Sequence, residues 1–399
     1  MEVTIKNTPL SGEITAPPSK SDAHRALICA ALADDPAVIK LSSTNEDIDA
    51  TIACLKALGA EIEKAEQWLE VHPIKRTVKS PVLDCGESGS TLRFLLPVAA
   101  AIAENARFEG RARLPERPIG DILLLLEENG CSASGKRLPL SLQGCLKAGV
   151  FRIPGDVSSQ FVSGLLMALP VLQGDSQIVL TTPLESAAYV DMTINTLRKF
   201  GVQIVRSAKG YSVPGCQTYR SPEEYEVEGD WSGAAFFEAA NIIGGNVKIS
   251  GLHADSAQPD KAIASFTKGL PDEVDVSAFP DLFPVLAVLA CSKQGDTLLK
   301  GAARLRIKES DRIAETARMI TDLGGDVDAG EDFLLIHGKG RLQGGITDSA
   351  NDHRIAMSAA IAAGICDEPV TVTGAEAVNK SFPGFWQEIK KLEHRKGEK

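Results

Sequence analysis

The sequence repeats one plan of about 70 residues six times. Each copy opens with a small polar cluster, continues into an Ala- and Leu-rich helical stretch and then reaches a short strand rich in β-branched residues. The six openings are Ser19-Lys20-Ser21, Ser88-Gly89-Ser90, Ser158-Ser159-Gln160, Asp230-Trp231-Ser232, Pro280-Asp281-Leu282 and Asn351-Asp352-His353. The strands that follow start near Ala37, Ala106, Ser176, Asn246, Asp296 and Pro369. Their starts lie 69, 70, 70, 50 and 73 residues apart, so only the fourth copy is short. Such a repeat restricts the fold to an array of similar units.

Each opening is typical of a helix N-terminus. Ser, Asp and Asn are preferred there because the side-chain oxygen accepts a bond from an otherwise unpaired backbone N–H. A second helix is predicted in four copies, over about 48–58, 121–128, 190–200 and 313–323. Each of these stretches ends at a glycine that predicts a left-handed C-terminal cap: Gly59, Gly130, Gly201 and Gly324. The plan per copy is therefore strand, helix, strand, helix and two further strands.

The repeat predicts a mixed α/β protein with two domains of three copies each. At 399 residues the chain is long for a single core. We expect one domain over 18–227 and a second over 228–399 plus 1–17. The first strand, about 2–14, is expected to complete a sheet of the second domain. The N-terminus does not resemble a signal peptide, and no apolar run is long enough to span a membrane, so we expect a cytoplasmic protein that does not bind membranes.

The composition and the motifs of the chain argue against several classes of function. The net charge of −11 argues against a general nucleic-acid surface. The eight cysteines are scattered and the six histidines lack metal-ligand spacing, so reduced thiols and no metal are expected. There is no GxGxxG dinucleotide fingerprint. The run 130–137 approaches a phosphate-binding loop, but it ends in Arg and follows a helix. The sequence thus predicts no cofactor.

Basic residues recur near the helix openings. Lys20 and Arg25 follow the first opening and Arg93 follows the second. Others are Arg111, Arg113, Arg117, Arg304, Arg306, Lys308, Arg312, Arg354 and Lys380. Any one of them could be an ordinary solvated side chain, and any one opening could be only a structural cap. Helix N-termini and arginines both suit anions, so the set favours a site for a multiply charged small molecule.

The segment 17–27, Pro-Pro-Ser-Lys-Ser-Asp-Ala-His-Arg-Ala-Leu, resembles the 5-enolpyruvylshikimate-3-phosphate (EPSP) synthase family. Further motifs in the family order are Gly89-Ser90-Thr91-Leu92-Arg93, Glu116-Arg117-Pro118-Ile119, Ser158-Ser159-Gln160-Phe161, Phe279-Pro280-Asp281, Lys308-Glu309-Ser310-Asp311-Arg312, Asp352-His353-Arg354 and Lys380-Ser381-Phe382-Pro383. The resemblance implies a two-domain inside-out α/β barrel, each domain with three βαβαββ repeats whose helix N-termini face an interdomain cleft. It also implies transfer of the enolpyruvyl group of phosphoenolpyruvate to the 5-hydroxyl of shikimate 3-phosphate, with release of phosphate through a tetrahedral intermediate.

Roles for individual residues follow from this resemblance. Asp281 is expected to take the 5-hydroxyl proton and Glu309 to protonate the methylene carbon, with Lys20, Lys308 and His353 also catalytic. Phosphoenolpyruvate is expected at Lys20, Gly89, Arg117, Gln160, Arg312, Arg354 and Lys380. Shikimate 3-phosphate is expected at Lys20, Ser21, Arg25, Ser158, Ser159, Gln160, Ser186, Asp281 and Lys308. The family implies a monomer without a cofactor or metal.

The chain departs from the family near the second opening. Glu87 stands where many relatives have Asn, Ser90 replaces the common Thr, and Phe94 follows Arg93. Gly89 is retained, so sensitivity to the herbicide glyphosate is expected.

Three alternatives remain open. A related UDP-N-acetylglucosamine enolpyruvyl transferase typically carries a loop Cys, and 109–120 has none. An RNA-terminal phosphate cyclase fits poorly with the acidic charge. A non-catalytic anion-binding protein would not need Asp281 and Glu309.

Overall fold

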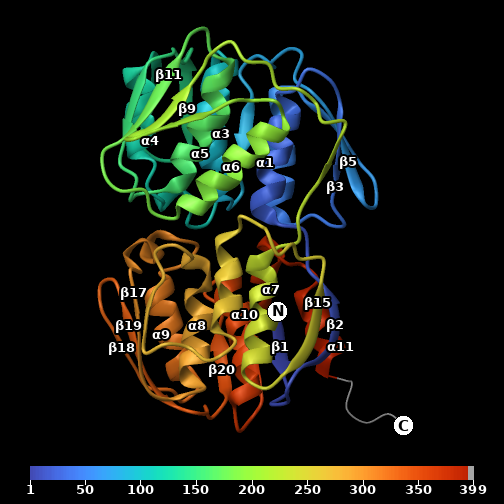
Figure 1. The fold of residues 1–399 in the computed structure, drawn as a ribbon, viewed down its shortest axis with the longest axis vertical. Coiled ribbons are helices and arrows are strands. Elements are labelled where there is room, and N and C mark those ends of the chain that lie inside the picture. The colour runs from blue at the N-terminus through green and yellow to red at the C-terminus, as the bar shows by residue number, and fades with distance from the viewer. Residues whose placement is uncertain (394–399) are drawn as a thin grey trace. The chain divides into compact units, whose positions relative to one another are not determined.

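The computed structural model describes residues 1–393 and divides into two compact units (Figure 1). The continuous unit is Pro18–Glu228. The split unit combines Met1–Pro17 with Gly229–Lys399. Both are mixed α/β and built from repeated strand–helix elements, as the sequence predicts.

The continuous unit contains three copies of the repeat and one additional strand. The first copy comprises α1 (Lys20–Ala31), β3 (Ala37–Lys40), α2 (Glu46–Leu58), β4 (Glu61–Lys64) and β5 (Trp68–His72). The second comprises β6 (Val82–Asp84), α3 (Gly89–Ile102), β7 (Asn105–Glu109), η1 (Leu114–Glu116), α4 (Gly120–Glu128), β8 (Cys131–Ala133) and β9 (Leu140–Gly144). The third comprises β10 (Val150–Ile153), α5 (Ser159–Ala168), η2 (Leu169–Val171), β11 (Ser176–Leu180), α6 (Ala187–Lys199), β12 (Val205–Ser207) and β13 (Gly210–Val213), and β14 (Glu224–Glu226) follows.

The three sheets of this unit share one topology. Their strand orders are β6-β7-β9-β8, β10-β11-β13-β12 and β14-β3-β5-β4. In each, the first two strands are parallel, and the last strand of the copy lies antiparallel between its neighbours. The late strand β14 occupies the place beside β3 that β6 and β10 occupy in their own sheets, so the end of the unit returns to its beginning.

The split unit begins with β1 (Glu2–Ile5) and β2 (Ser11–Thr15) and resumes after the continuous unit. The fourth copy comprises α7 (Trp231–Ile242), β15 (Asn246–Ser250) and η3 (Pro259–Phe266). The fifth comprises β16 (Glu273–Asp275), η4 (Pro280–Leu282), α8 (Phe283–Cys291), β17 (Gln294–Lys300), η5 (Ala303–Ile307), α9 (Arg312–Asp322), β18 (Val327–Ala329) and β19 (Leu334–Lys339). The sixth comprises β20 (Gly345–Asp348), α10 (His353–Ala362), η6 (Ala363–Ile365), β21 (Val370–Thr373), η7 (Ala375–Lys380) and α11 (Phe385–Glu393).

The N-terminal segment corrects one prediction. The single strand expected over about 2–14 is two strands in different sheets. β1 runs antiparallel to β21, and β2 runs parallel to β15. In Figure 1 both blue strands lie among the late elements of the split unit. The fourth copy is short because η3 leads directly to β16, where the first, second, third and fifth copies insert an antiparallel strand pair.

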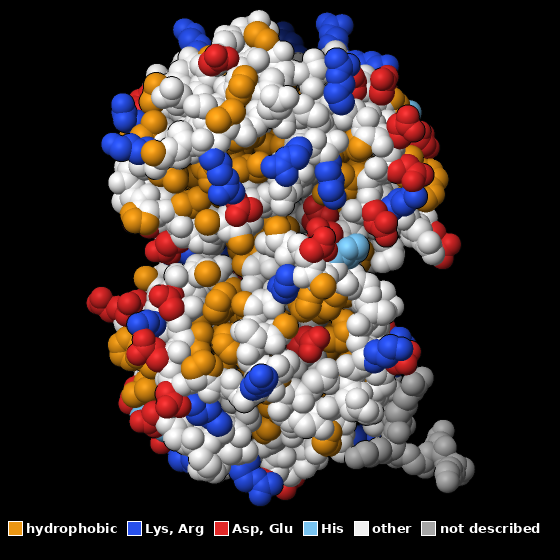
Figure 2. Space-filling view, in the orientation of Figure 1, with side chains coloured by type: hydrophobic (Ala, Val, Ile, Leu, Met, Phe, Trp, Pro, Cys, Tyr) orange, Lys and Arg blue, Asp and Glu red, His pale blue; other side chains and the backbone are white. Residues whose placement is uncertain are grey.

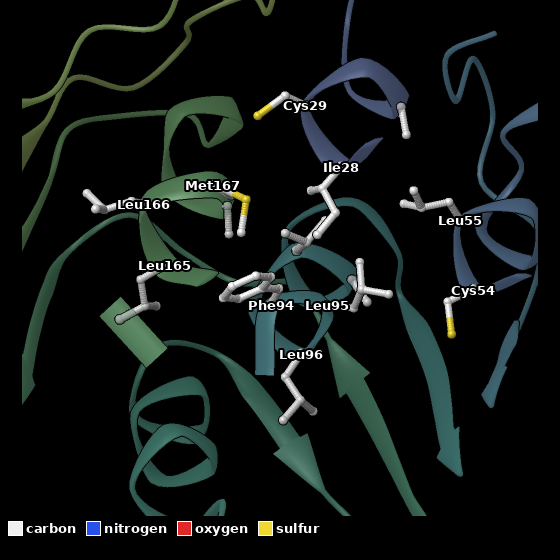
Figure 3. Close-up of a cluster of buried hydrophobic side chains, with 14 of the residues drawn as sticks. Ile28, Cys29, Cys54, Leu55, Phe94, Leu95, Leu96, Leu165, Leu166 and Met167 are labelled. Carbon is white, nitrogen blue, oxygen red and sulfur yellow. The ribbon is translucent and has the colours of Figure 1, made fainter. Parts of the chain in front are cut away.

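The first helix of each copy is buried on nearly every side. This holds for α1, α3, α5, α7, α8 and α10. Helices that are apolar all round belong in a core. Figure 3 shows side chains of α1, α2, α3 and α5 converging in the continuous unit, with Ile28, Phe94 and Leu165 among them. The sheets cover this helical core, which is the inside-out arrangement expected from the resemblance.

Five of the six openings cap a helix as predicted. Ser19, Ser88, Ser158, Asp230 and Asp352 each accept a backbone N–H from the first turn that follows. The fifth opening differs, because the apolar Phe279 precedes η4 and Asp281 bonds instead to arginines. The four glycines that follow second helices all have positive φ, between 75° and 115°, as a left-handed cap requires.

Candidate active site

Lys20 begins α1 and is paired with an acidic residue that the motifs did not identify. Its Nζ lies 2.8 Å from Oδ2 of Asp47, in the first turn of α2. The two side chains are 14% and 11% exposed, so the ion pair is partly shielded from water. Shielding strengthens the attraction between the charges and fixes the ammonium beside the openings of both helices.

Arg25 is one turn further into α1 and almost fully buried. It donates to Oγ1 of Thr193 at 2.7 Å, to the carbonyl of Ser21 at 2.6 Å and to the carbonyl of Tyr189 at 2.9 Å. Its guanidinium also lies 5.0 Å from the centre of the Phe94 ring. Burial lowers the pKa of Arg25 to about 10, which leaves it cationic at neutral pH. Arg25 therefore holds α1 against α6 as a charged group.

Arg117 packs against the start of α3. A Cβ added at Gly89 would lie 2.5 Å from Nη1 and 2.7 Å from Cζ of Arg117. Only glycine leaves room for a guanidinium this close to the helix N-terminus. The second opening thus combines a cation with the free N–H groups of a helix, both of which favour an anion.

Gln160, in the first turn of α5, has its amide fixed from both ends. Its Oε1 accepts from Nη1 of Arg93 at 2.8 Å, and its Nε2 donates to Oγ of Ser90 at 2.8 Å. Ser90 is one of the departures from the family pattern, and its hydroxyl, carried on Cβ as in Thr, reaches the amide. Arg93 and Ser90 were quoted in motifs without a role, and the structure makes them the partners that orient Gln160.

The four serines predicted to bind shikimate 3-phosphate lie at helix openings of the continuous unit, and Ser21 follows Lys20 in the first turn of α1. Ser158 caps α5 and Ser159 begins it. Ser186 precedes α6 with a left-handed backbone, φ 52°, and is buried. A non-glycine residue in this region is uncommon and marks a position held by its surroundings.

Arg312 is the centre of a buried ion network in the split unit. Its Nη1 lies 2.7 Å from Oδ1 of Asp281, its Nη2 lies 2.7 Å from Oε2 of Glu309, and its Nε lies 2.8 Å from Oδ2 of Asp352. The Arg312 side chain is only 1% exposed. Ser310 donates to the same oxygen of Asp352 at 3.0 Å. Glu309 of the Lys308–Arg312 motif and Asp352 of the sixth opening therefore both bond to the Arg312 guanidinium.

Asp281 lies between two arginines. Nη2 of Arg354 is 3.2 Å from its Oδ2, on the side opposite Arg312. Burial alone would raise the pKa of Asp281. Arg354 and Arg312, with Lys308, outweigh burial and hold this pKa well below its ordinary value. Asp281 is thus an ionised carboxylate in a largely enclosed position.

Two further predicted residues lie at the sixth copy. His353 begins α10 and is buried. Lys380, at the end of η7, is buried and donates from Nζ to the carbonyl of Asn351 at 2.6 Å, so it lies at the opening of α10. Arg354 and Lys380 thus place two cations around one helix start.

The residues 5–389 match the family model for EPSP synthase (3-phosphoshikimate 1-carboxyvinyltransferase). The chain belongs to the EPSP synthase family. A 3-phosphoshikimate 1-carboxyvinyltransferase of Clostridium acetobutylicum is 44% identical to it over 98% of this chain and 97% of that protein. One from Clostridium kluyveri is also 44% identical over the same shares. The EPSP synthase of Acinetobacter baumannii has a solved structure with a TM-score of 0.81 at 26% identity, covering 98% of both chains.

These matches confirm the family that the motifs indicated and the fold it implies. As an EPSP synthase family member the chain is a transferase of the shikimate pathway. The motif-quoted residues lie in two clusters, one in each unit. The motifs do not identify Asp47, which pairs with Lys20, or the part that Asp352 plays in holding Arg312.

Residues 1–393 contain no group of three His, Cys, Asp or Glu side chains that could hold a metal ion. No helix within that range is long and apolar enough to cross a membrane. All eight cysteines are free thiols. On the face drawn in Figure 2, Lys and Arg side chains are interspersed with Asp and Glu in each unit.

Proposed function

We propose that this chain transfers the enolpyruvyl group of phosphoenolpyruvate to the 5-hydroxyl of shikimate 3-phosphate, using the cluster of polar and basic residues in each unit. Family membership supports the reaction, and the ion network of Asp281, Glu309, Arg312 and Arg354 is the observation that carries the residue roles. This network presents two carboxylates and two fixed cations together. Proton transfer and stabilisation of a leaving phosphate require that combination.

Phosphoenolpyruvate carries a phosphate and a carboxylate, and we assign it to the cations of both units. In the continuous unit the cations are Lys20 and Arg117, with Gly89 and Gln160 beside them as further donor-binding residues. In the split unit they are Arg312, Arg354 and Lys380. Arginine suits the task because its planar fork pairs with two oxygens at once.

Shikimate 3-phosphate is assigned chiefly to the continuous unit. Ser21, Ser158, Ser159 and Ser186 offer hydroxyl groups beside helix N-termini, where a phosphate is favoured. Arg25, Lys20 and Gln160 would supply further donors, and Asp281 and Lys308 would act at the 5-hydroxyl. In this proposal 18–227 is the shikimate 3-phosphate domain, and 228–399 with 1–17 contributes the acid–base groups.

The addition step needs a base and an acid. Asp281 accepts the 5-hydroxyl proton as that oxygen bonds to C2 of phosphoenolpyruvate, while Glu309 donates a proton to C3. The adduct is tetrahedral at C2. In the elimination step C3 returns a proton to the now ionised Glu309, the C2–C3 double bond reforms and phosphate leaves with the C–O electron pair. Lys20, Lys308 and His353 line the reacting groups, and the cations stabilise the departing phosphate.

The arginines also set the basicity of Asp281. While Arg312 and Arg354 bond to it, Asp281 is a weak base because its pKa is held low. The anionic groups of phosphoenolpyruvate compete for the same guanidiniums. Binding of the donor therefore weakens the hold on Asp281 and raises its pKa towards the value that a proton acceptor needs.

Isosteric variants test these roles. Asp281→Asn and Glu309→Gln each remove one carboxylate without changing side-chain size, and each should lower kcat about 10²–10⁴-fold. Calorimetric titration with shikimate 3-phosphate should give affinities close to wild type. Full turnover by both variants would show that the acid–base roles are wrong.

We also propose a monomer in the cytoplasm, with no nucleic-acid or membrane partner. Light scattering during size exclusion should give one species near the chain mass of 42.4 kDa. A mass of twice that value would contradict the monomer.

A further inference from the structure

One residue occupies a repeated functional position without an assigned role. In every copy a polar or charged residue lies 28 to 32 residues after the first residue of the opening, near the start of the second helix or its counterpart. In copy order these residues are Asp47, Arg117, Ser186, Asp260, Arg312 and Lys380. Four are proposed substrate-binding residues, and Asp47 bonds to Lys20. Asp260, in the short fourth copy, is the remaining one.

Asp260 is connected to the donor site through Ser232. The Asp260 side chain is fully buried at the start of η3, and the hydroxyl of Ser232 donates to its Oδ2. The carbonyl of the same Ser232 accepts from Nη1 of Arg354 at 2.9 Å. Nη2 of Arg354 then reaches Asp281 at 3.2 Å. A continuous series of contacts thus joins Asp260 to the proposed base.

The segment around this series is itself held in place. The side chain of Gln258 accepts from the backbone N–H of Trp231 at 3.0 Å and donates to the carbonyl of Gly229 at 2.8 Å. Asp230 caps α7 through the N–H groups of Ser232 and Gly233. The starts of η3 and α7 are therefore fixed to each other, and Ser232 is held from both its backbone and its side chain.

The charges around Asp260 have opposing effects. Burial and the neighbouring Asp281 raise its pKa, while Arg354 and the bond from Ser232 lower it. Asp230 adds a further, smaller increase. The balance leaves the pKa of Asp260 at about 7. This carboxyl therefore changes charge near neutral pH beside a guanidinium that is proposed to hold an anion.

We propose that Asp260, acting through Ser232, is a positioning residue that holds Arg354 for the anionic donor and adjusts the charge around it. The proposal rests on the role of Arg354 in binding phosphoenolpyruvate proposed above. In its charged form Asp260 partly offsets the positive charge of Arg354, and this weakens the attraction of Arg354 for the anionic donor. In its neutral form Asp260 still accepts the bond from Ser232 but does not offset the charge of Arg354. The donor therefore binds more tightly below the pKa of Asp260 than above it.

The test compares KM for phosphoenolpyruvate between pH 6 and 8.5 in several full-length variants. Ser232→Ala and Asp260→Ala remove the connection and should raise this KM about 10-fold, as expected for loss of one hydrogen bond in a charged network. Asp260→Asn keeps an acceptor for the Ser232 hydroxyl and removes the charge. Its KM at pH 6 should stay within about twofold of wild type. The donor phosphate titrates alike in both proteins, so the ratio of wild-type to Asp260→Asn KM should rise between pH 6 and 8.5.

A matched control separates positioning from general destabilisation. Thr347→Val removes another hydroxyl–carboxylate bond, from the buried Thr347 to the partly exposed Asp322 at 2.8 Å. Asp322 ends α9, ten residues from Arg312 and so about 15 Å along the helix. This variant should leave KM for phosphoenolpyruvate and its pH dependence at wild-type values. KM for shikimate 3-phosphate should stay unchanged in every variant of the series.

The possible failures are distinguishable. If Arg354→Lys leaves KM for phosphoenolpyruvate unchanged, the proposed role of Arg354 is wrong and this inference is wrong with it. If Arg354→Lys raises that KM but Ser232→Ala and Asp260→Ala do not, only the role of Asp260 is overturned. A KM ratio between wild type and Asp260→Asn that stays constant with pH would overturn the charge effect.

Discussion

Replacing Arg312 with methionine should destabilise the split unit strongly. The change leaves Asp352 fully buried, with Asp281 and Glu309 nearby, and removes the guanidinium that lies within 2.8 Å of all three carboxylates. Removing one partner of a buried ion pair costs about 3–5 kcal/mol, because a buried charge is left uncompensated. Arg312→Lys keeps the charge, but a single ammonium cannot span three carboxylates. The loss of stability in Arg312→Lys should therefore be smaller than in Arg312→Met, about 1.5–3 kcal/mol.

The destabilisation should depend on pH in a defined direction. The folded-state pKa of Asp281 is lowered, so its contribution to stability is present above the unfolded-state pKa of about 3.9 and is lost as pH falls below that value. In Arg312→Met the Asp281 carboxylate loses one of the cations that lower its pKa and protonates more readily, which relieves the unfavourable charge. The free-energy difference between wild type and variant should therefore be largest near pH 7 and shrink towards pH 4.

Tryptophan fluorescence during urea unfolding can follow the split unit. Trp231 and Trp386 are buried in that unit, whereas Trp68 lies in the continuous unit and is 37% exposed. A Trp68→Phe background therefore restricts the signal to the unit that contains Arg312.

Arg318→Met is the matched control for this experiment. Arg318 is on the same helix and pairs with Glu315 at 2.6 Å, but it is 40% exposed. Exposed pairs contribute about 0–1 kcal/mol, so this variant should unfold close to wild type. The reasoning fails if Arg312→Met is no more destabilised than Arg318→Met at pH 7. It also fails if the stability difference between wild type and Arg312→Met grows as the pH is lowered.

Two further predictions concern the donor site of the continuous unit. Gly89→Ala should displace the Arg117 guanidinium, because the new Cβ would lie 2.5 Å from its Nη1. KM for phosphoenolpyruvate should rise about 10-fold, and KM for shikimate 3-phosphate should stay unchanged. Glyphosate is expected to compete with the donor in wild type, and its inhibition of this variant should be weaker. Wild-type turnover that persists at high glyphosate would contradict this. Ser90→Ala removes one of the two bonds that orient the Gln160 amide, and should raise KM for phosphoenolpyruvate about 3- to 10-fold; steady-state kinetics that show no change would rule out the orienting role.

The repeat made most of the architecture predictable from the sequence. Local signals were sufficient for the caps at Ser19, Ser88 and Ser158 and for the glycines after second helices, since both depend on a few neighbouring residues. The sequence predicts wrongly that the opening at Asp281 is a cap, because an acidic residue before a helix looks the same whether it caps or pairs with a distant arginine. The arginine that decides the matter lies 31 residues away.

The missed residues share one cause. Asp47 bonds 27 residues away and Asp260 bonds 28 residues away, so neither belongs to the motif of its partner. The repeat contained the necessary signal, because both residues lie at the same phase as Arg117 and Arg312. A comparison of all copies position by position, and not only of their openings, would have indicated them. The break between β1 and β2 depends on pairing with β21 and β15, which local sequence does not encode.

Release of phosphate from phosphoenolpyruvate tests the central claim most directly. Purified protein should release phosphate when shikimate 3-phosphate is the acceptor and should not do so in a parallel reaction with UDP-N-acetylglucosamine. Release with UDP-N-acetylglucosamine alone would contradict the acceptor while keeping the donor. The absence of release with either acceptor, from protein that binds shikimate 3-phosphate, would contradict the catalytic account altogether.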